Sequence, residues 1–137
     1  MSARAHARQL SLVLAAGAVG ALANSVALWA AGTSGLTHAL GVRIAPPLSA
    51  EWLVPRIVWG ALWGLLFLLP LASQRWVAQG IALSLFPTLV QLFVIFPHRA
   101  GLDVLGTKLG TLTPLVVVAA NALWGLAASA WLRVTGR

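Results

Sequence analysis

Four long apolar stretches dominate this chain of 137 residues, and none of them contains a lysine, arginine, aspartate or glutamate. The uncharged stretches are residues 9–42, 57–74, 76–98 and 109–132. A helix that crosses a membrane needs about 20 mostly apolar residues, because the hydrocarbon core of a bilayer is about 30 Å thick. The pattern therefore predicts an integral membrane protein with four transmembrane helices.

The overall composition favours the same class of protein. Hydrophobic residues make up 60% of the chain and charged residues 8%, whereas an ordinary soluble domain contains roughly 25% charged residues. The formal net charge is +7. Because the basic residues flank the apolar stretches, we expect them to meet the lipid bilayer and not nucleic acid. The chain has no cysteine, which excludes disulfides and thiol catalysis.

The predicted fold is all-α, and we place the spans at residues 10–31, 53–71, 76–96 and 112–132. Only helices are expected, because in lipid each backbone N–H and C=O must be paired within its own segment. Proline closes the second span at Pro70 and directly follows the third at Pro97, where a helix is expected to end. The length allows one membrane domain, residues 1–137, and no second domain.

The orientation is predicted from the basic residues outside the spans. Arg4 and Arg8 precede the first span, so both termini are expected in the cytoplasm and the two longer loops outside. An alternative is that residues 1–23 form a cleaved secretory signal, since Ala21-Leu22-Ala23 resembles a cleavage site. The apolar run continues to residue 31, beyond the usual core of about 7–15 residues, so we favour an uncleaved span.

The two halves of the sequence resemble each other. The pentapeptide ALWGL at residues 61–65 recurs at 122–126, and LGVRI at 40–44 matches LGTKL at 105–109. In the first helix of each half, Gly17, Ala21 and Asn24 align with Ser84, Thr88 and Gln91. Chance similarity is the alternative, because leucine and alanine are so common here. We favour a duplicated two-helix unit, with half repeats at about 10–71 and 76–132, whose copies run parallel because each contains an even number of spans.

Small and polar residues form a stripe along each predicted helix, at steps of three or four residues that place them on one face. The candidate site residues are Asn24, Gly60, Gly64, Ser84, Thr88, Gln91, Asn121 and Gly125. We favour a packing role, in which small residues let helices approach closely and polar side chains bond across the interface. The alternative is that the amides line a polar path. Packing is favoured because the ionisable residues are expected outside the spans.

The ionisable residues of the two longer loops show no metal-binding spacing. They are His38, Arg43 and Glu51 in the first loop, and His98, Arg99, Asp103 and Lys108 in the second. We therefore predict no metal, no cofactor and no catalytic residue. Leucines and other apolar residues recur through both loops, which favours short interfacial or re-entrant helices.

A family resemblance rests on two short segments of the second half. Gln91-Leu92-Phe93-Val94 stands before Pro97 and a glycine-rich loop, and Asn121-Ala122-Leu123-Trp124 stands before a basic end at Arg133. This pattern resembles small uncharacterised bacterial inner-membrane proteins of the YagU type. The resemblance implies residence in the bacterial inner membrane and no settled biochemical activity, and it transfers no site residues.

The leading functional hypothesis is a small multi-pass inner-membrane protein that serves as a non-enzymatic subunit or scaffold, as a homo-oligomer or with a membrane protein partner. The alternative is a small channel or transporter, formed by oligomerisation around the polar stripes. A membrane enzyme is the weakest reading, because no nucleophile–base pair or metal set is visible in the sequence.

Overall fold

The computed structural model describes residues 2–136, and within this range the chain is helical and contains no strand. Four helical segments are long and apolar enough to cross a membrane. They are Ala3–Thr33, Ala50–Leu68, Trp76–His98 and Thr113–Val134. The prediction of an all-α chain with four candidate transmembrane segments is confirmed, and each predicted span overlaps one observed segment.

The first two segments begin at serine caps. Helix α1 (Ala3–Thr33) follows Ser2, whose side chain accepts the backbone N–H of Ala5 at 3.1 Å. Helix α3 (Ala50–Trp63) follows Ser49, which accepts the N–H of Trp52 at 3.3 Å, and it continues into the 3-10 helix η1 (Gly64–Leu68). Such caps satisfy backbone donors that the first turn of a helix leaves free.

The third segment changes its helical type near one end. Helix α4 (Trp76–Val90) is followed without a break by a π-helical turn, η2 (Gln91–Ile95), and by the short helix α5 (Phe96–His98). The fourth segment is one helix, α6 (Thr113–Val134). The π-helical turn starts at Gln91, one of the predicted site residues, and such turns often occur at functional sites.

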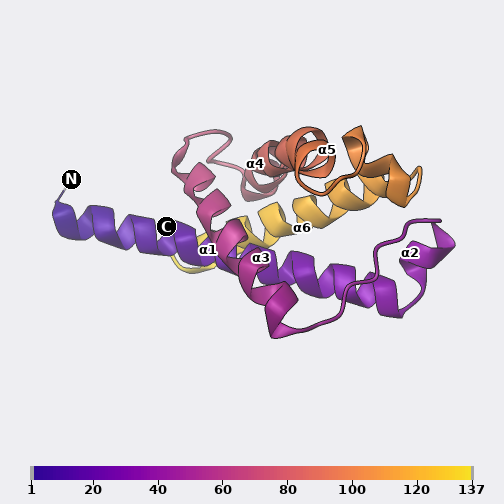
Figure 1. Cartoon of the computed structure of the whole chain (residues 1–137). Coiled ribbons are helices and arrows are strands. Elements are labelled where there is room, and N and C mark those ends of the chain that lie inside the picture. Colours follow the sequence, from indigo (N-terminus) through magenta and orange to yellow (C-terminus); the bar gives the residue numbers. More distant parts are fainter. Residues whose placement is uncertain (1, 137) are drawn as a thin grey trace.

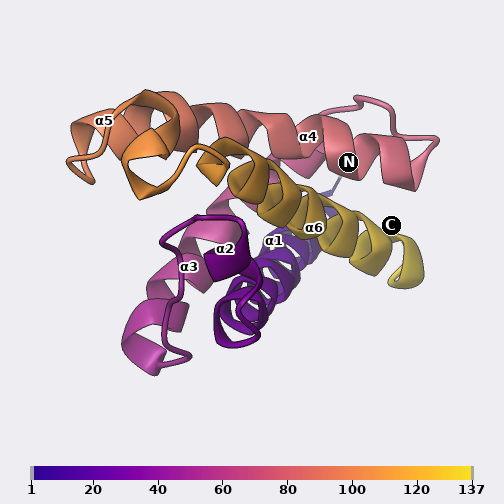
Figure 2. The ribbon, with the colours of Figure 1, turned by 90° about the vertical axis from the view of Figure 1, so that its right-hand side faces the viewer.

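The helices form two pairs that meet at the centre of the molecule. Helix α3 packs on α1, α4 packs on α6, and α1 contacts α6 between the two pairs. In Figure 1, α3 crosses in front of α1, and α4 lies above α6. In Figure 2 both termini and the connection from η1 to α4 lie at one end, while α2 (Leu36–Ala39) and α5 lie at the other. The chain therefore crosses from end to end four times.

Close contacts between glycines hold each pair together. A Cβ atom on Gly17 would lie 2.9 Å from the Cα atoms of both Ala61 and Gly64, and a Cβ atom on Gly80 would lie 2.6 Å from the carbonyl oxygen of Gly125. A real Cβ is essentially never found so close to backbone, so these positions have no room for a side chain. Gly64, the first residue of η1, is thus part of the interface between α1 and the second segment, and Gly125 is part of the α4–α6 interface.

The buried core lies where the two pairs meet. Val13, Phe67, Leu83 and Trp124 are among its buried members. The indole Nε1–H of Trp124 donates to the carbonyl oxygen of Gly17 at 3.1 Å, which links α6 to α1. Most of the exposed large side chains are apolar, including Val58 on α3 and Leu89 on α4, as expected for helices that face lipid.

The two longer loops contact each other at one end of the molecule. The first loop contains α2, and the second contains the 3-10 segment η3 (Val104–Leu109). The backbone N–H of Arg43 donates to the carbonyl of Leu109 at 2.7 Å, and the Arg43 guanidinium donates to the carbonyl of Lys108. Short interfacial or re-entrant helices were expected in these loops. The first loop contains the short helix α2, whereas the 3-10 segment η3 is interrupted at Leu105 and Gly106, whose φ angles are positive.

Candidate functional site: a polar cluster around Arg56

Four polar side chains meet at the centre of the bundle. The Asn24 amide on α1 donates to the Asn121 side-chain oxygen on α6 at 3.0 Å. The Asn121 amide donates in turn to Thr88 Oγ1 at 3.0 Å and to Gln91 Oε1 at 3.3 Å. Asn24, Thr88 and Asn121 are buried. The predicted stripes on α1, α4 and α6 are thus joined, and Asn121 lies between Asn24 and Gln91, the two residues that the predicted repeat would align.

The hydroxyl groups of α4 are oriented by their own helix. Ser84 donates to the carbonyl of Ile81 at 2.7 Å, and Thr88 donates to the carbonyl of Ser84 at 2.7 Å. Because the Thr88 proton is used in this way, its oxygen is free to accept the Asn121 amide. Ser84 takes no part in the amide cluster and instead packs beside Gly125, where a Cβ on the glycine would lie 3.1 Å from the Ser84 Cβ.

The expectation that the ionisable residues lie outside the spans is wrong for Arg56. This residue belongs to α3, within the candidate transmembrane segment Ala50–Leu68, and its side chain points into the bundle. Its Nε–H donates to Ser25 Oγ at 2.9 Å, and its Nη2 donates to Asn24 Oδ1 at 2.7 Å. The guanidinium carbon also lies 4.7 Å from the centroid of the Trp52 ring, which is within cation–π range.

These bonds extend the polar cluster to all four segments. Hydrogen bonds run from Arg56 on α3 to Asn24 on α1, then to Asn121 on α6, and from there to Thr88 and Gln91 in the third segment. The two oxygens that accept hydrogen bonds from the Arg56 guanidinium, Ser25 Oγ and Asn24 Oδ1, are neutral. The chain contains only two acidic residues, the exposed Glu51 and the partly exposed Asp103, and neither lines the two cavities beside the cluster. The cluster therefore carries a positive charge that no carboxylate within it neutralises.

The sequence contained one signal that could have identified Arg56. Arg56, Gly60 and Gly64 are spaced four residues apart, so the arginine shares the helix face of the glycines that pack on α1. Arg56 lies three residues inside the predicted span 53–71, close to the end where basic residues usually flank a transmembrane helix. Its partners, Asn24 and Ser25, lie 32 and 31 residues earlier in the chain, and sequence spacing alone does not bring them together.

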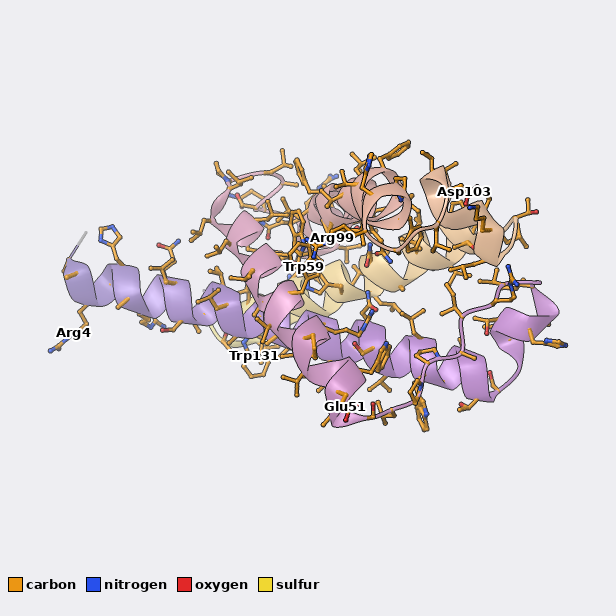
Figure 3. The ribbon with its side chains drawn as sticks, in the orientation of Figure 1. Arg4, Glu51, Trp59, Arg99, Asp103 and Trp131 are labelled. Carbon is orange, nitrogen blue, oxygen red and sulfur yellow. The ribbon has the colours of Figure 1, made fainter. Side chains whose placement is uncertain are left out.

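A cavity of about 440 Å³ lies between α3 and the third segment, against the polar cluster. Its lining includes Arg56, Trp59 and Trp63 of α3, and Gln91 and Arg99 from the other side. Figure 3 labels Trp59 and Arg99, which come from the two opposite walls. The volume falls within the range of about 300–1,000 Å³ that is usual for small-molecule sites.

A second cavity of about 190 Å³ lies towards the two long loops. Ile44 and Leu109 of the loops, and Trp52 of α3, are part of its lining. Four residues line both cavities, namely Asn24, Arg56, Gln91 and Asn121. The polar cluster thus separates a cavity on the loop side from a larger one between the helices.

Of the remaining predicted residues, Gly60 lines the larger cavity, while Gly64 and Gly125 lie in helix interfaces. Outside the spans, the partly exposed Asp103 carboxylate accepts hydrogen bonds from the Thr107 hydroxyl and the Lys108 backbone N–H. The Thr107 bond, followed by the Lys108 bond, lowers the pKa of Asp103 below its ordinary value. Between residues 2 and 136, no three histidine or acidic side chains gather in a group that could hold a metal ion.

Comparison with known proteins gives no further assignment for this site. No protein-family model, no curated protein and no solved structure matches the chain.

Proposed function

We propose that this chain is a non-enzymatic integral membrane protein that binds an anionic group at the polar cluster around Arg56. The observation that carries the proposal is the contact of the Arg56 guanidinium with Asn24 and Ser25 inside a membrane-crossing segment. An ionisable residue within the membrane is by default a functional-site hypothesis. In this proposal the chain is still a small membrane subunit, and the cavity is the place where that subunit binds its ligand.

Energetics favour binding over packing as the role of this arginine. Inserting a charged side chain into a transmembrane helix is unfavourable, by about 2.5–3.5 kcal/mol at the helix centre and less towards its ends, whereas leucine is favourable by about 0.3–0.6 kcal/mol. A side chain needed only for packing would therefore be apolar. The neutral oxygens of Asn24 and Ser25 orient the guanidinium and share its charge without cancelling it. An anion in the adjoining cavity would neutralise the remaining positive charge of the guanidinium.

A channel or transporter is the second candidate function. It is favoured by the four polar residues that line both cavities. If the contact between Asn24 and Asn121 opened, the two cavities would join into one polar passage between the loop side and the space between the helices. Substrate-dependent flux into vesicles containing the purified protein would support this candidate, and binding without flux would support the first.

The internal duplication is a further part of the proposal, and matching features of the two halves support it. Gly41 and Gly106, at equivalent positions of the two loops, both adopt the left-handed conformation, with φ of 71° and 67°. A Cβ on Gly64 would lie 3.1 Å from the Gly17 Cα, and a Cβ on Gly125 would lie 3.1 Å from the Ser84 Cβ, at the aligned positions. The units would be the α1–α3 pair and the α4–α6 pair.

The proposed location is the bacterial inner membrane, with both termini in the cytoplasm. The YagU resemblance supports the compartment, and Arg4 and Arg8 support the orientation. Reporter fusions after residue 137 and within residues 100–110 test it, and an external C-terminus would refute it. Signal cleavage after Ala23 is disfavoured because Gly17 and Gly20, which it would remove, pack against α3 and α6.

The binding proposal is tested by thermal unfolding of the full-length protein in mild detergent. The probes are inorganic phosphate, acetate, dodecyl phosphate and dodecanoate at constant ionic strength. At least one of them should raise the melting temperature of the parent protein by mass action and leave that of Arg56→Gln unchanged. Arg133→Gln is the matched control, since Arg133 lies in the last turn of α6 and does not line the cavity. No shift with any probe, or equal shifts in Arg56→Gln, would refute the proposal.

A further inference from the structure

The larger cavity opens on the outer side of the bundle. Helix α3 packs on α1 and α4 packs on α6, so the space between α3 and the third segment faces outward from the central helices. Trp59, which lines the cavity, is 51% exposed, and Arg99 in the opposite wall is also exposed. Exposed surface on this flank of a transmembrane bundle faces the membrane, so a ligand reaches the cavity sideways from the lipid.

Two arginines from different segments line the cavity at different depths. Arg99 directly follows α5, at the end of the molecule that carries the long loops. Arg56 lies six residues after the start of α3 at Ala50, on the same side, which places it about 9 Å further along the helix. The described lining of the cavity contains no acidic residue, and the amides of Asn24, Gln91 and Asn121 supply neutral polar groups between the cations.

We propose that this cavity binds the phosphate group of an anionic lipid, which enters between α3 and the third segment. The inference rests on the proposed function and names its ligand class. Guanidinium groups pair with phosphate through parallel N–H···O bonds, and a phosphate has enough oxygen atoms to engage two of them. A carboxylate would be satisfied by one arginine. The phosphate is held by Arg56 and Arg99.

The apolar part of the cavity suits the rest of such a lipid. Trp59, Val90 and Ile95 line it together with the polar groups. An acyl chain that leaves the cavity between the helices meets Val58 and Leu89, which are exposed apolar residues of α3 and α4. A free phosphate ion shares the headgroup chemistry, but it gains nothing from this apolar wall and does not arrive from the lipid side.

Native mass spectrometry of the full-length protein in mild detergent tests the inference. The protein is titrated with phosphatidylglycerol, with diacylglycerol carrying the same chains, and with inorganic phosphate. We expect one phosphatidylglycerol to bind more tightly than either of the others. Arg99→Gln should weaken this binding by about tenfold or more, because one charge-assisted contact is lost. Since Arg99 is exposed, this variant is expected to fold, and Arg56→Gln should show the same loss.

Each other outcome overturns the inference. If diacylglycerol bound as tightly as phosphatidylglycerol, the phosphate group would contribute nothing and the cavity would bind lipid through apolar contacts alone. If inorganic phosphate bound as tightly, the ligand would be a free anion and not a lipid. That result would contradict this inference and agree with the proposed function. Phosphatidylglycerol binding that is unchanged in both variants, or reduced equally by Arg133→Gln, would reflect only general attraction to a basic surface. Failure of the proposed function is recognised separately, because no anion would then change the melting temperature.

Discussion

The side-chain amide of Asn24 donates to the side-chain oxygen of Asn121 across the α1–α6 interface, at 3.0 Å and in a buried environment. This bond joins the two helix pairs, because α1 belongs to one pair and α6 to the other. It also connects the Arg56 side of the polar cluster to the Thr88 and Gln91 side. The stability of the bundle centre and the geometry of both cavities therefore depend on the same two side chains.

A double-mutant cycle on this pair is predicted to show favourable coupling. Asn24→Ala and Asn121→Ala should each destabilise the fold, because each leaves buried polar partners unsatisfied, at about 1–3 kcal/mol. The coupling energy should be about 0.6 kcal/mol, the average for such bonds in a membrane protein. Reversible unfolding in mixed micelles measures it. Asn24→Ala combined with Ser129→Ala is the control, since Ser129 bonds to the Trp76 carbonyl elsewhere, and additive effects are expected there.

Enlarging Gly64 is predicted to separate α1 from the second segment. A Cβ at this position would lie 3.1 Å from the Cα of Gly17 and closer still to the Val13 carbonyl, so Gly64→Ala should cost about 1–3 kcal/mol through overpacking. The melting temperature in detergent should fall, and Gly64→Leu should lower the folded yield further. Leu62→Ala, at a side chain that is 53% exposed, should change little. Equal stability of the parent and Gly64→Ala would show that this face does not pack on α1.

The tryptophans of the two ALWGL pentapeptides, Trp63 and Trp124, are predicted to respond differently to substitution. Trp124 donates its indole N–H to Gly17, whereas the buried indole N–H of Trp63 has no hydrogen-bond partner within residues 2–136. Trp124→Phe should therefore lose about 0.5–1.5 kcal/mol more than Trp63→Phe, since both lose similar volume and only one loses a hydrogen bond. Thermal unfolding of both variants provides the comparison. A larger loss for Trp63→Phe would contradict the assigned contact.

The hydrogen bonds that the Asp103 carboxylate accepts within its loop are predicted to weaken in acid. The hydrogen bond from Thr107, then that from Lys108, lowers the pKa of Asp103 below 3.8 in the folded protein. The stabilisation of the folded protein by the ionised Asp103 carboxylate is therefore fully present above pH 3.8, and it is lost as the pH falls through the lower pKa of the folded protein. An NMR titration of the carboxyl carbon should give a midpoint below 3.8, and Thr107→Val should raise it. A midpoint that does not move in Thr107→Val would exclude this cause.

The sequence was sufficient to predict the class of fold because that class depends on local properties. Uninterrupted apolar runs predicted four helical segments, and the structure has four segments long and apolar enough to cross a membrane. Steps of three and four residues placed Asn24, Thr88, Gln91 and Asn121 on stripes, and these side chains meet. In a membrane such polar stripes must turn towards one another, because lipid offers no hydrogen bonds.

The inward orientation of Arg56 could not be predicted in the same way. An arginine near the end of a span usually extends its long side chain towards the headgroups. Whether it does so depends on what lies beside it, and its neighbours Asn24 and Ser25 come from another helix. The pairing of α1 with α6 and the π-helical turn at Gln91 depend on tertiary contacts as well. The amides of the cluster could therefore be predicted from the sequence, whereas the charged group that contacts Asn24 could not.

Side-chain NMR of arginine tests whether Arg56 binds an anion within the membrane. The full-length protein, labelled with ¹⁵N-arginine, is titrated with dodecyl phosphate in detergent, and the Arg56 signal is identified by its absence in Arg56→Gln. We predict saturable shifts of the Nε–H signals of Arg56 and Arg99, with no change at Arg133. An Arg56 signal that does not move while dodecyl phosphate is added, or shifts of equal size at Arg133, would contradict anion binding at Arg56.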